Sequence, residues 1–315
     1  MIRSLIHRSR LWHALAILLT VVALAFVLAQ LVKGWSAARD YPWQWRPGYL
    51  LLSFISAQAA YLTLTRAWRS VLRAISIRIG LRTAYWVFIL SNLGRYIPGR
   101  VWQFGTAALF ARSLGLPPGE IGASMVVYQF FLLPVGVLLG LLAGGTGGFV
   151  QDSWMRVGLW GGAAVMGACA LWPHRLMRLV SPLLARIGTS PDRWRMEWSR
   201  KLAVAVQCAA GWLLLCLAFS WLVIGTTDLG SSRIPELSGV FLVSYIAGYV
   251  SLLTPGGLGV REGVMTIMLT PWTGAGPAAA LSILSRLWIT ATEVVALLPA
   301  WWWYRKDAQR TGGTG

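Results

Sequence analysis

Acidic residues, cysteines and histidines are all scarce in this chain. Asp and Glu number 10 against 28 Lys and Arg, and the 315 residues include only three Cys and three His. The acids are scattered, without a DxD motif or a histidine pair. A membrane-embedded lipid-modifying transferase generally gathers an acid, a base or a metal in one place. We therefore expect a protein that is not an enzyme.

Metal and cofactor chemistry have little support in the sequence. Cys169, Cys208 and Cys216 all lie inside apolar runs without metal-ligand spacing, so we expect packing residues. His7, His13 and His174 lie near the ends of apolar runs, at the expected membrane edges, and form no HExxH motif. We expect no cofactor and no metal.

Long apolar runs dominate the composition. Hydrophobic residues make up 57% of the chain, and the mean hydropathy is +0.62. About 20 apolar residues are needed to cross the roughly 30 Å hydrocarbon layer of a bilayer. The pattern predicts an all-α polytopic membrane protein, a single transmembrane domain over residues 1–315. Its six full-length candidate spans are 11–32, 48–65, 120–145, 154–172, 203–225 and 277–304.

Positive charge is concentrated in short segments between the apolar runs. The net charge is +18, but this placement fits membrane topology and anionic headgroups rather than nucleic acid. The segment 66–82 suits a helix lying in the interface or a positive topological loop, and the basic stretch 175–201 requires no ligand. The 19 tryptophans fit aromatic belts at the water boundary. We expect no nucleic-acid partner.

Two Pro-Gly turns interrupt apolar sequence. They lie in SNLGRYIPGRVWQF (91–104) and SLLTPGGLGVREG (251–263), and Pro98 and Pro255 are 157 residues apart. The broken segments, 83–110 and 238–270, are each too short for two full spans. Each is therefore either one kinked crossing or a hairpin that enters and leaves by the same face.

The basic loops choose between these alternatives. Two hairpins place most Lys and Arg, including the most basic loop, 173–202, on one side with both termini. That side is cytoplasmic by the positive-inside rule. We therefore predict two oppositely oriented re-entrant helical hairpins.

Helix, hairpin and helix recur at the same spacing in both halves of the chain. Residues 48–145 form the first predicted repeat half and residues 203–304 the second, running in opposite directions. Inverted repeats with discontinuous helices are typical of secondary transporters, whose substrate sites lie near the midplane.

The hairpin tips carry the candidate site residues. A half-helix that begins at a Pro-Gly turn presents unpaired N–H groups inside the membrane, which favours an anion. Arginine binds phosphate oxygens with a planar fork. The charged candidates near these turns and in the last span are Arg95, Arg100, Arg261, Glu262, Arg286 and Glu293. Alternatively, Arg261 or Arg286 pairs with Glu262 or Glu293 to hold helices together, and Glu293 is either a proton carrier or a fixed counter-ion.

GRYIPGRVW together with LTPGGLGVREG resembles the flippase-like transmembrane domain of the lysylphosphatidylglycerol synthase family, over roughly residues 10–305. The resemblance implies lipid translocation in the bacterial cytoplasmic (inner) membrane, here by a stand-alone member lacking the aminoacyl-transferase domain. It also implies a headgroup region, formed by Arg95, Pro98, Gly99, Arg100, Pro255, Gly256, Gly257, Gly259, Arg261 and Glu262.

These observations predict a lipid translocator that moves an anionic, phosphate-bearing headgroup through a midplane site. The expected partner is a phospholipid or a polyprenyl-phosphate-type lipid, and a lipid-synthesis enzyme is a candidate protein partner. A membrane-embedded transferase and a scaffold for an envelope-synthesis enzyme are the alternatives.

Overall fold

The protein is helical in the computed structural model. The structure describes residues 32, 35–96, 102–147, 153–179, 194–251 and 257–312. Within these ranges the chain forms helices and no strand. In this described part of the chain, four helices are long and apolar enough to cross a membrane. They are α3 (Pro47–Ala74), α6 (Pro118–Gly147), α10 (Trp198–Thr226) and α13 (Ala275–Gly312). The protein is therefore an α-helical, multi-pass membrane protein.

The other two predicted spans are less complete. The segment 154–172 forms α7 (Ser153–Leu171), of which Trp160–Leu171 is an apolar stretch shorter than a full span. The segment 11–32 lies outside the described residues except for its last residue. Two short helices complete this part of the chain, α2 (Trp35–Arg39) and α8 (Pro173–Leu179).

Both broken segments form pairs of short helices. The first contains α4 (Leu81–Asn92), a 3-10 turn (Leu93–Tyr96) and α5 (Trp102–Ser113). The second contains α11 (Ile234–Val250) and α12 (Val260–Thr273). At 1.5 Å per residue, helices of this size are about 18–26 Å long and fall short of the roughly 30 Å hydrocarbon layer. Re-entry into the membrane from one face remains a prediction.

The order of helices recurs along the chain. A long helix, two short helices and a second long helix occur as α3 to α6 and again as α10 to α13. α5 and α12 begin at Trp102 and Val260, and α6 and α13 begin at Pro118 and Ala275. The second of these shifts equals the 157-residue spacing of the two prolines.

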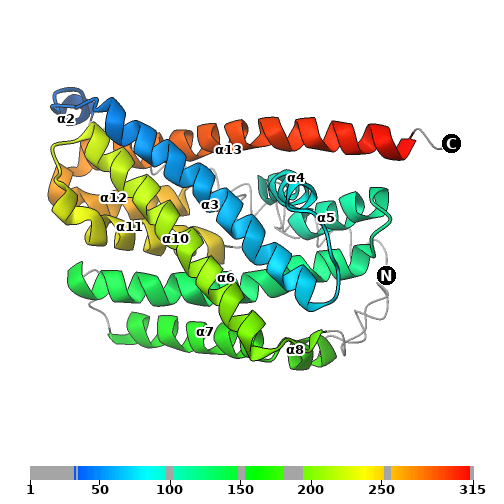
Figure 1. Ribbon diagram of the computed structural model, residues 1–315. Coiled ribbons are helices and arrows are strands. Elements are labelled where there is room, and N and C mark those ends of the chain that lie inside the picture. The colour runs from blue at the N-terminus through cyan, green and yellow to red at the C-terminus, as the bar shows by residue number, and fades with distance from the viewer. Residues whose placement is uncertain are drawn as a thin grey trace, which may run out of the picture.

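The two short pairs lie at opposite ends of α13 (Figure 1). Near the end of α13, Asp307 forms an ion pair with Arg82 of α4 and accepts a hydrogen bond from Trp86 Nε1 at 3.0 Å. In its first half, Ser282 is hydrogen-bonded to Thr266 of α12 at 3.1 Å. On α6 the order of the two pairs is reversed. The first pair contacts the beginning of α6 through α5, and the second pair contacts its later part through α11.

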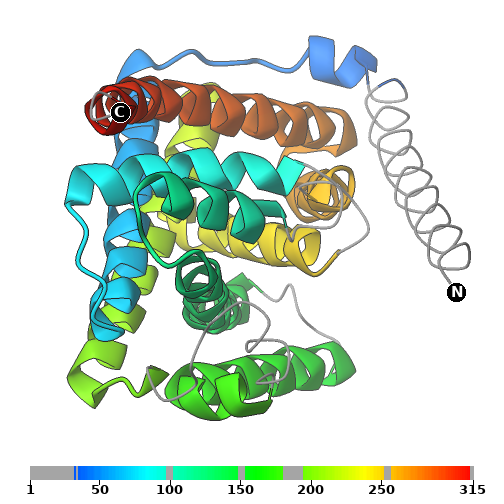
Figure 2. The ribbon, with the colours of Figure 1, turned by 90° about the vertical axis from the view of Figure 1, so that its right-hand side faces the viewer.

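Among the described helices, α3 and α10 pack against each other most extensively. Figure 2 shows these two helices together along one edge of the molecule, across the ends of the other layers. Gly211 of α10 lies against the Leu64 side chain of α3, so the backbone of α10 approaches closely there. Ser53 Oγ of α3 donates to the Ala218 carbonyl at 2.5 Å. These contacts connect the first helices of the two repeated sets.

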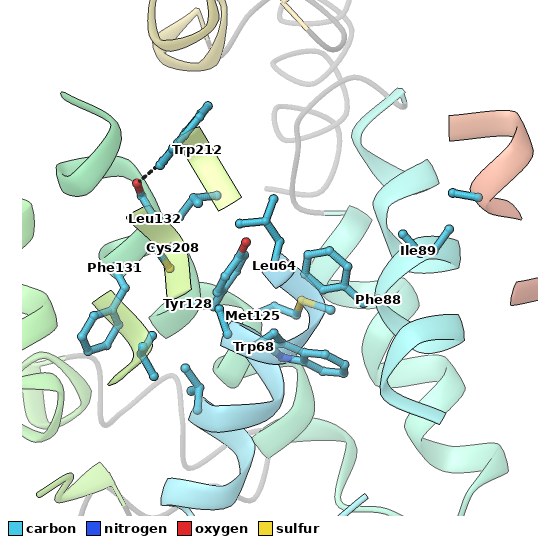
Figure 3. Packing of buried hydrophobic residues seen from close by; sticks show 14 of the residues in the cluster. Leu64, Trp68, Phe88, Ile89, Met125, Tyr128, Phe131, Leu132, Cys208 and Trp212 are labelled. Carbon is cyan, nitrogen blue, oxygen red and sulfur yellow. Dashed lines mark hydrogen bonds between the residues drawn. The ribbon is translucent and has the colours of Figure 1, made fainter. Parts of the chain in front are cut away.

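Buried aromatic side chains fill the centre of the bundle (Figure 3). Trp212 of α10 is 1% exposed, and its indole N–H donates to the Leu132 carbonyl of α6 at 2.8 Å. Trp68 is fully buried and donates to Ser124 Oγ at 2.9 Å. Trp86 and Trp194 are also buried, so the aromatic-belt interpretation does not hold for these four tryptophans.

Gly136 of α6 provides a test of this packing. A Cβ atom at Gly136 would lie 2.8–3.0 Å from the ring of Trp212, which is held by its hydrogen bond. We expect Gly136→Ala to lower the free energy of unfolding by about 1–3 kcal/mol, because the ring must move. Thermal and denaturant unfolding in detergent would measure the change.

Gly105→Ala is the matched control, since nothing lies within 4 Å of its Cβ position in α5. This variant should be neutral or more stable by about 0.5–1 kcal/mol, as alanine favours a helix. Equal stabilities of the two variants would contradict the packing described for Trp212.

Candidate functional site

A cavity of about 100 Å³ lies between the two repeated sets of helices. Residues from all four helices of each set line it, from α3 to α6 and from α10 to α13. Aromatic rings form much of its wall. The polar and charged lining residues are Tyr61, Asn92, Gln103, Tyr128, Gln129, Tyr245, Tyr249, Arg261, Arg286 and Glu293.

Arg261 is the most buried cation of this cavity. It is the second residue of α12, follows the positive-φ glycines Gly257 and Gly259, and is 5% exposed. Its guanidinium carbon lies 5.4 Å and 5.5 Å from the ring centroids of Phe241 and Tyr245 on α11. Among the described residues, its Nη2 has no hydrogen-bond partner. Arg261 therefore brings unused donor capacity to the wall of a largely aromatic cavity.

Glu262 fixes the start of α12. Its Oε2 accepts a hydrogen bond from the Gly259 backbone N–H at 2.7 Å, which satisfies one of the donors exposed at a helix N-terminus. Its Oε1 lies 3.5 Å from Arg286 Nη1 of α13. The two side chains are 7% and 17% exposed. For this pair, the geometry agrees with the alternative in which opposite charges hold two helices together.

Arg286 and Glu293 line the cavity from two turns of α13. Together with Arg261 and Glu262 they form a charge-balanced set of two cations and two carboxylates. The predicted excess of positive charge therefore depends on Arg95 and Arg100. The structure describes the backbone of Arg95, in the 3-10 turn, but not its side chain.

The Pro-Gly turns lie outside the described residues. This applies to Pro98, Gly99, Arg100, Pro255 and Gly256, whose place in the site stays a prediction. Of the other predicted site residues, Arg261, Arg286 and Glu293 share the cavity, and Glu262 lies beside it through its ion pair.

Glycines bring the arms of each short pair into contact. A Cβ atom at Gly257 would lie 2.6 Å from the Gly248 carbonyl oxygen of α11. A Cβ atom at Gly94 would lie 2.5 Å from the Gln103 nitrogen of α5. In both sets, the end of the first arm packs against the beginning of the second, which directs the start of α5 and of α12 towards the cavity.

Several lining residues were not among the predicted site residues. They include Tyr61, Asn92, Gln103, Tyr245 and Tyr249. The 157-residue shift could have found some of them, because it relates Asn92 of α4 to Tyr249 of α11. Hydroxyl and amide side chains on otherwise apolar helices are the relevant signal.

Tyr128 of α6 adds a second buried group. It is 2% exposed, and its hydroxyl has no hydrogen-bond partner within the described part of the chain. Its ring packs edge to face on Phe88, with centroids 5.7 Å apart. A buried hydroxyl without a partner carries a free-energy cost that a polar ligand would remove.

A smaller pocket shares Tyr61, Asn92 and Glu293 with the central cavity. Its other lining residues, among them Leu93 and Leu297, are apolar, and Leu93 is 43% exposed. This side pocket lies between α3, α4 and α13. It adjoins the polar cavity, and Leu93 in its wall is also exposed on the outside of the bundle.

Comparison with known proteins agrees with this architecture. No curated protein sequence matches the chain. The family model described as "Lysylphosphatidylglycerol synthase TM region" matches residues 12–296, which include every residue that lines the cavity. Because this match covers most of the sequence, the chain belongs to the family of the lysylphosphatidylglycerol synthase transmembrane region.

Proposed function

We propose that the protein is a lipid translocator that moves an anionic, phosphate-bearing headgroup across the bacterial cytoplasmic membrane through the central cavity. The observation that carries this proposal is Arg261, a buried arginine with an unbonded Nη2 in a cavity lined by both repeated sets. Family membership supports a flippase-like membrane protein. The proposal includes no bond-making step.

The chemistry of the cavity favours an acceptor-rich anion. A buried guanidinium N–H without an acceptor is costly, and phosphate oxygens match its planar fork. Tyr128 offers a second donor from the opposite set of helices. The rings of Phe241 and Tyr245 position the guanidinium and exclude water, which strengthens its interaction with an anion.

The arrangement of the short helices supports alternating access. The proposed re-entrant hairpins, α4 with α5 and α11 with α12, pack at opposite ends of α13, so each can close the cavity towards one face. The lipid tails would stay in the bilayer. In this proposal both termini are cytoplasmic, and Glu293 is a counter-ion or a proton carrier beside the headgroup.

A flipping assay in reconstituted vesicles tests the proposal. With a fluorescent phosphatidylglycerol, Arg261→Gln should slow translocation about 10- to 100-fold, because a hydrogen bond to a charged group contributes about 1.5–3 kcal/mol. Arg261→Lys should give an intermediate rate, since it keeps the charge and loses the fork. Arg100→Ala should also slow translocation.

Arg233→Gln is the matched control. Arg233 also lies beside an aromatic ring, Trp272, but its side chain is 45% exposed and lies outside the cavity. The Arg233→Gln variant should translocate the lipid at the same rate as the unmodified protein. Unchanged rates in Arg261→Gln and Arg100→Ala, in protein shown to be folded by thermal unfolding, would refute the proposed site.

A further inference from the structure

Two basic segments meet at the end of α3 and the beginning of α10. The residues Arg73, Arg78, Arg195 and Arg200, with Glu197, line one open cavity of about 540 Å³. We call this cavity the basic pocket. It shares no lining residue with the central cavity.

A specific backbone geometry brings these segments together. After α3 ends at Ala74, the Ile77 N–H donates back to the Leu72 carbonyl at 2.9 Å. Ser76 in this turn has φ 67°, a left-handed conformation that is uncommon for residues other than glycine. Arg200 Nη1 of α10 then donates to the Arg73 carbonyl at 3.1 Å, across 127 residues of sequence. The pocket is therefore a built concavity, not two independent loops.

Arginines outnumber carboxylates among the described residues that line the pocket. These residues include four arginines and one carboxylate, Glu197, which lies 3.5 Å from Arg200 Nε. The positive field extends to the neighbouring helix α8. Burial lowers the pKa of His174, and nearby Arg178, Arg175 and Arg195 lower it further. A concavity lined by arginines attracts an anion.

Exposed tryptophans mark the depth of the pocket in the membrane. Trp198 begins α10 and is 63% exposed, and Trp172 precedes α8 and is 39% exposed. The Lys201 ammonium lies 4.4 Å from the centroid of the Trp198 ring. Tryptophan and lysine together are typical of the membrane–water interface. We therefore expect the arginines of the pocket to lie close to the level of lipid phosphates.

We propose that the basic pocket is a second anion site, which binds a phosphate group at the membrane surface. Arg73 and Arg78 contact the phosphate from the α3 side, and Arg195 and Arg200 from the α10 side. The phosphate belongs to a lipid headgroup or to a soluble phosphate. Binding there is independent of translocation through the central cavity.

The experiment uses the full chain in phosphatidylcholine nanodiscs with a phosphatidylglycerol that carries a photoreactive headgroup. Crosslinked peptides are mapped by mass spectrometry. We expect crosslinks within 73–78 and 195–200. Arg73→Gln/Arg78→Gln and Arg195→Gln/Arg200→Gln should each reduce them about tenfold, because both segments contribute to one site. Arg66→Gln/Arg112→Gln removes two exposed charges outside the pocket and should leave them unchanged.

Competition identifies the source of the phosphate. Displacement by unlabelled phosphatidylglycerol alone supports a lipid headgroup, and displacement by inorganic phosphate as well supports a soluble phosphate. Equal crosslinking in the control and the two pocket variants would overturn the proposal. Normal flipping by the pocket variants would be consistent with binding at the basic pocket, because that binding is independent of translocation. If Arg261→Gln did not slow flipping, only the proposal for the central cavity would fail.

Discussion

Gly257→Ala is expected to lower the free energy of unfolding by about 2–4 kcal/mol and to abolish translocation. Gly257 has φ +72°, which costs a residue with a Cβ atom about 1–2 kcal/mol. The added Cβ would also lie 2.6–2.9 Å from the backbone of Gly248, where no side chain can move away. Overpacking of this kind costs about 1–3 kcal/mol. Thermal unfolding and the flipping assay would measure both effects.

The functional loss follows from the position of Gly257 before α12. Relief of the clash must separate α11 from α12, and Gly248 also lies against Arg261, whose Cβ is 3.0 Å from the Cβ position at Gly248. Gly161→Ala in α7 is the control, because nothing lies within 4 Å of its Cβ position. A Gly257→Ala protein with native stability and rate would refute the close contact between the two arms.

Glu262→Gln is the second substitution with a large expected effect. It removes the buried carboxylate that lies 3.5 Å from the largely covered Arg286. Loss of one partner of a buried pair costs about 3–5 kcal/mol. Glutamine can still accept the hydrogen bond from Gly259, so the loss reports mainly the ion pair. We expect a decrease of about 3 kcal/mol in the free energy of unfolding.

Glu236→Gln tests whether burial, and not only the distance between the charges, determines how much stability an ion pair contributes. Glu236 lies 3.6 Å from Arg233, nearly the same separation, but the side chains of this pair are 22% and 45% exposed. Its loss should cost less than about 1 kcal/mol. The double variant Glu262→Gln/Arg286→Gln should recover part of the stability lost in Glu262→Gln, because the cation that Glu262 balanced is removed as well. Equal costs for the two single variants would show that burial does not strengthen the Glu262–Arg286 pair.

Hydropathy predicted the long helices well because apolar length is a strong constraint in a membrane. α6 and α13 begin within two residues of the predicted spans 120–145 and 277–304. α3 continues to Ala74, beyond the predicted end at 65. Hydropathy ended the span at the first arginine, but the arginines that follow are part of the same helix. The prediction that the tryptophans form aromatic belts was less successful. Composition does not distinguish a buried indole, such as that of Trp212, from one at the membrane interface.

The candidate site was predicted in part. Charge in an apolar run identified Arg261, Arg286 and Glu293, which line one cavity. The sequence left open which acid pairs with which arginine, because pairing depends on the approach of α12 to α13. The basic pocket was not predicted either. It requires the contact between Arg200 and Arg73, which no local pattern encodes.

The side pocket between α3, α4 and α13 has a consequence for selectivity in the proposed mechanism. If a lipid headgroup enters by way of this side pocket, the acyl chains can stay in the surrounding bilayer throughout. The free-energy cost of translocation is then almost entirely the dehydration of the headgroup. Hydrogen bonds from Arg261 and Tyr128 would offset that cost. The protein would accordingly discriminate among lipids by the chemistry of their headgroups and tolerate wide variation in chain length and saturation.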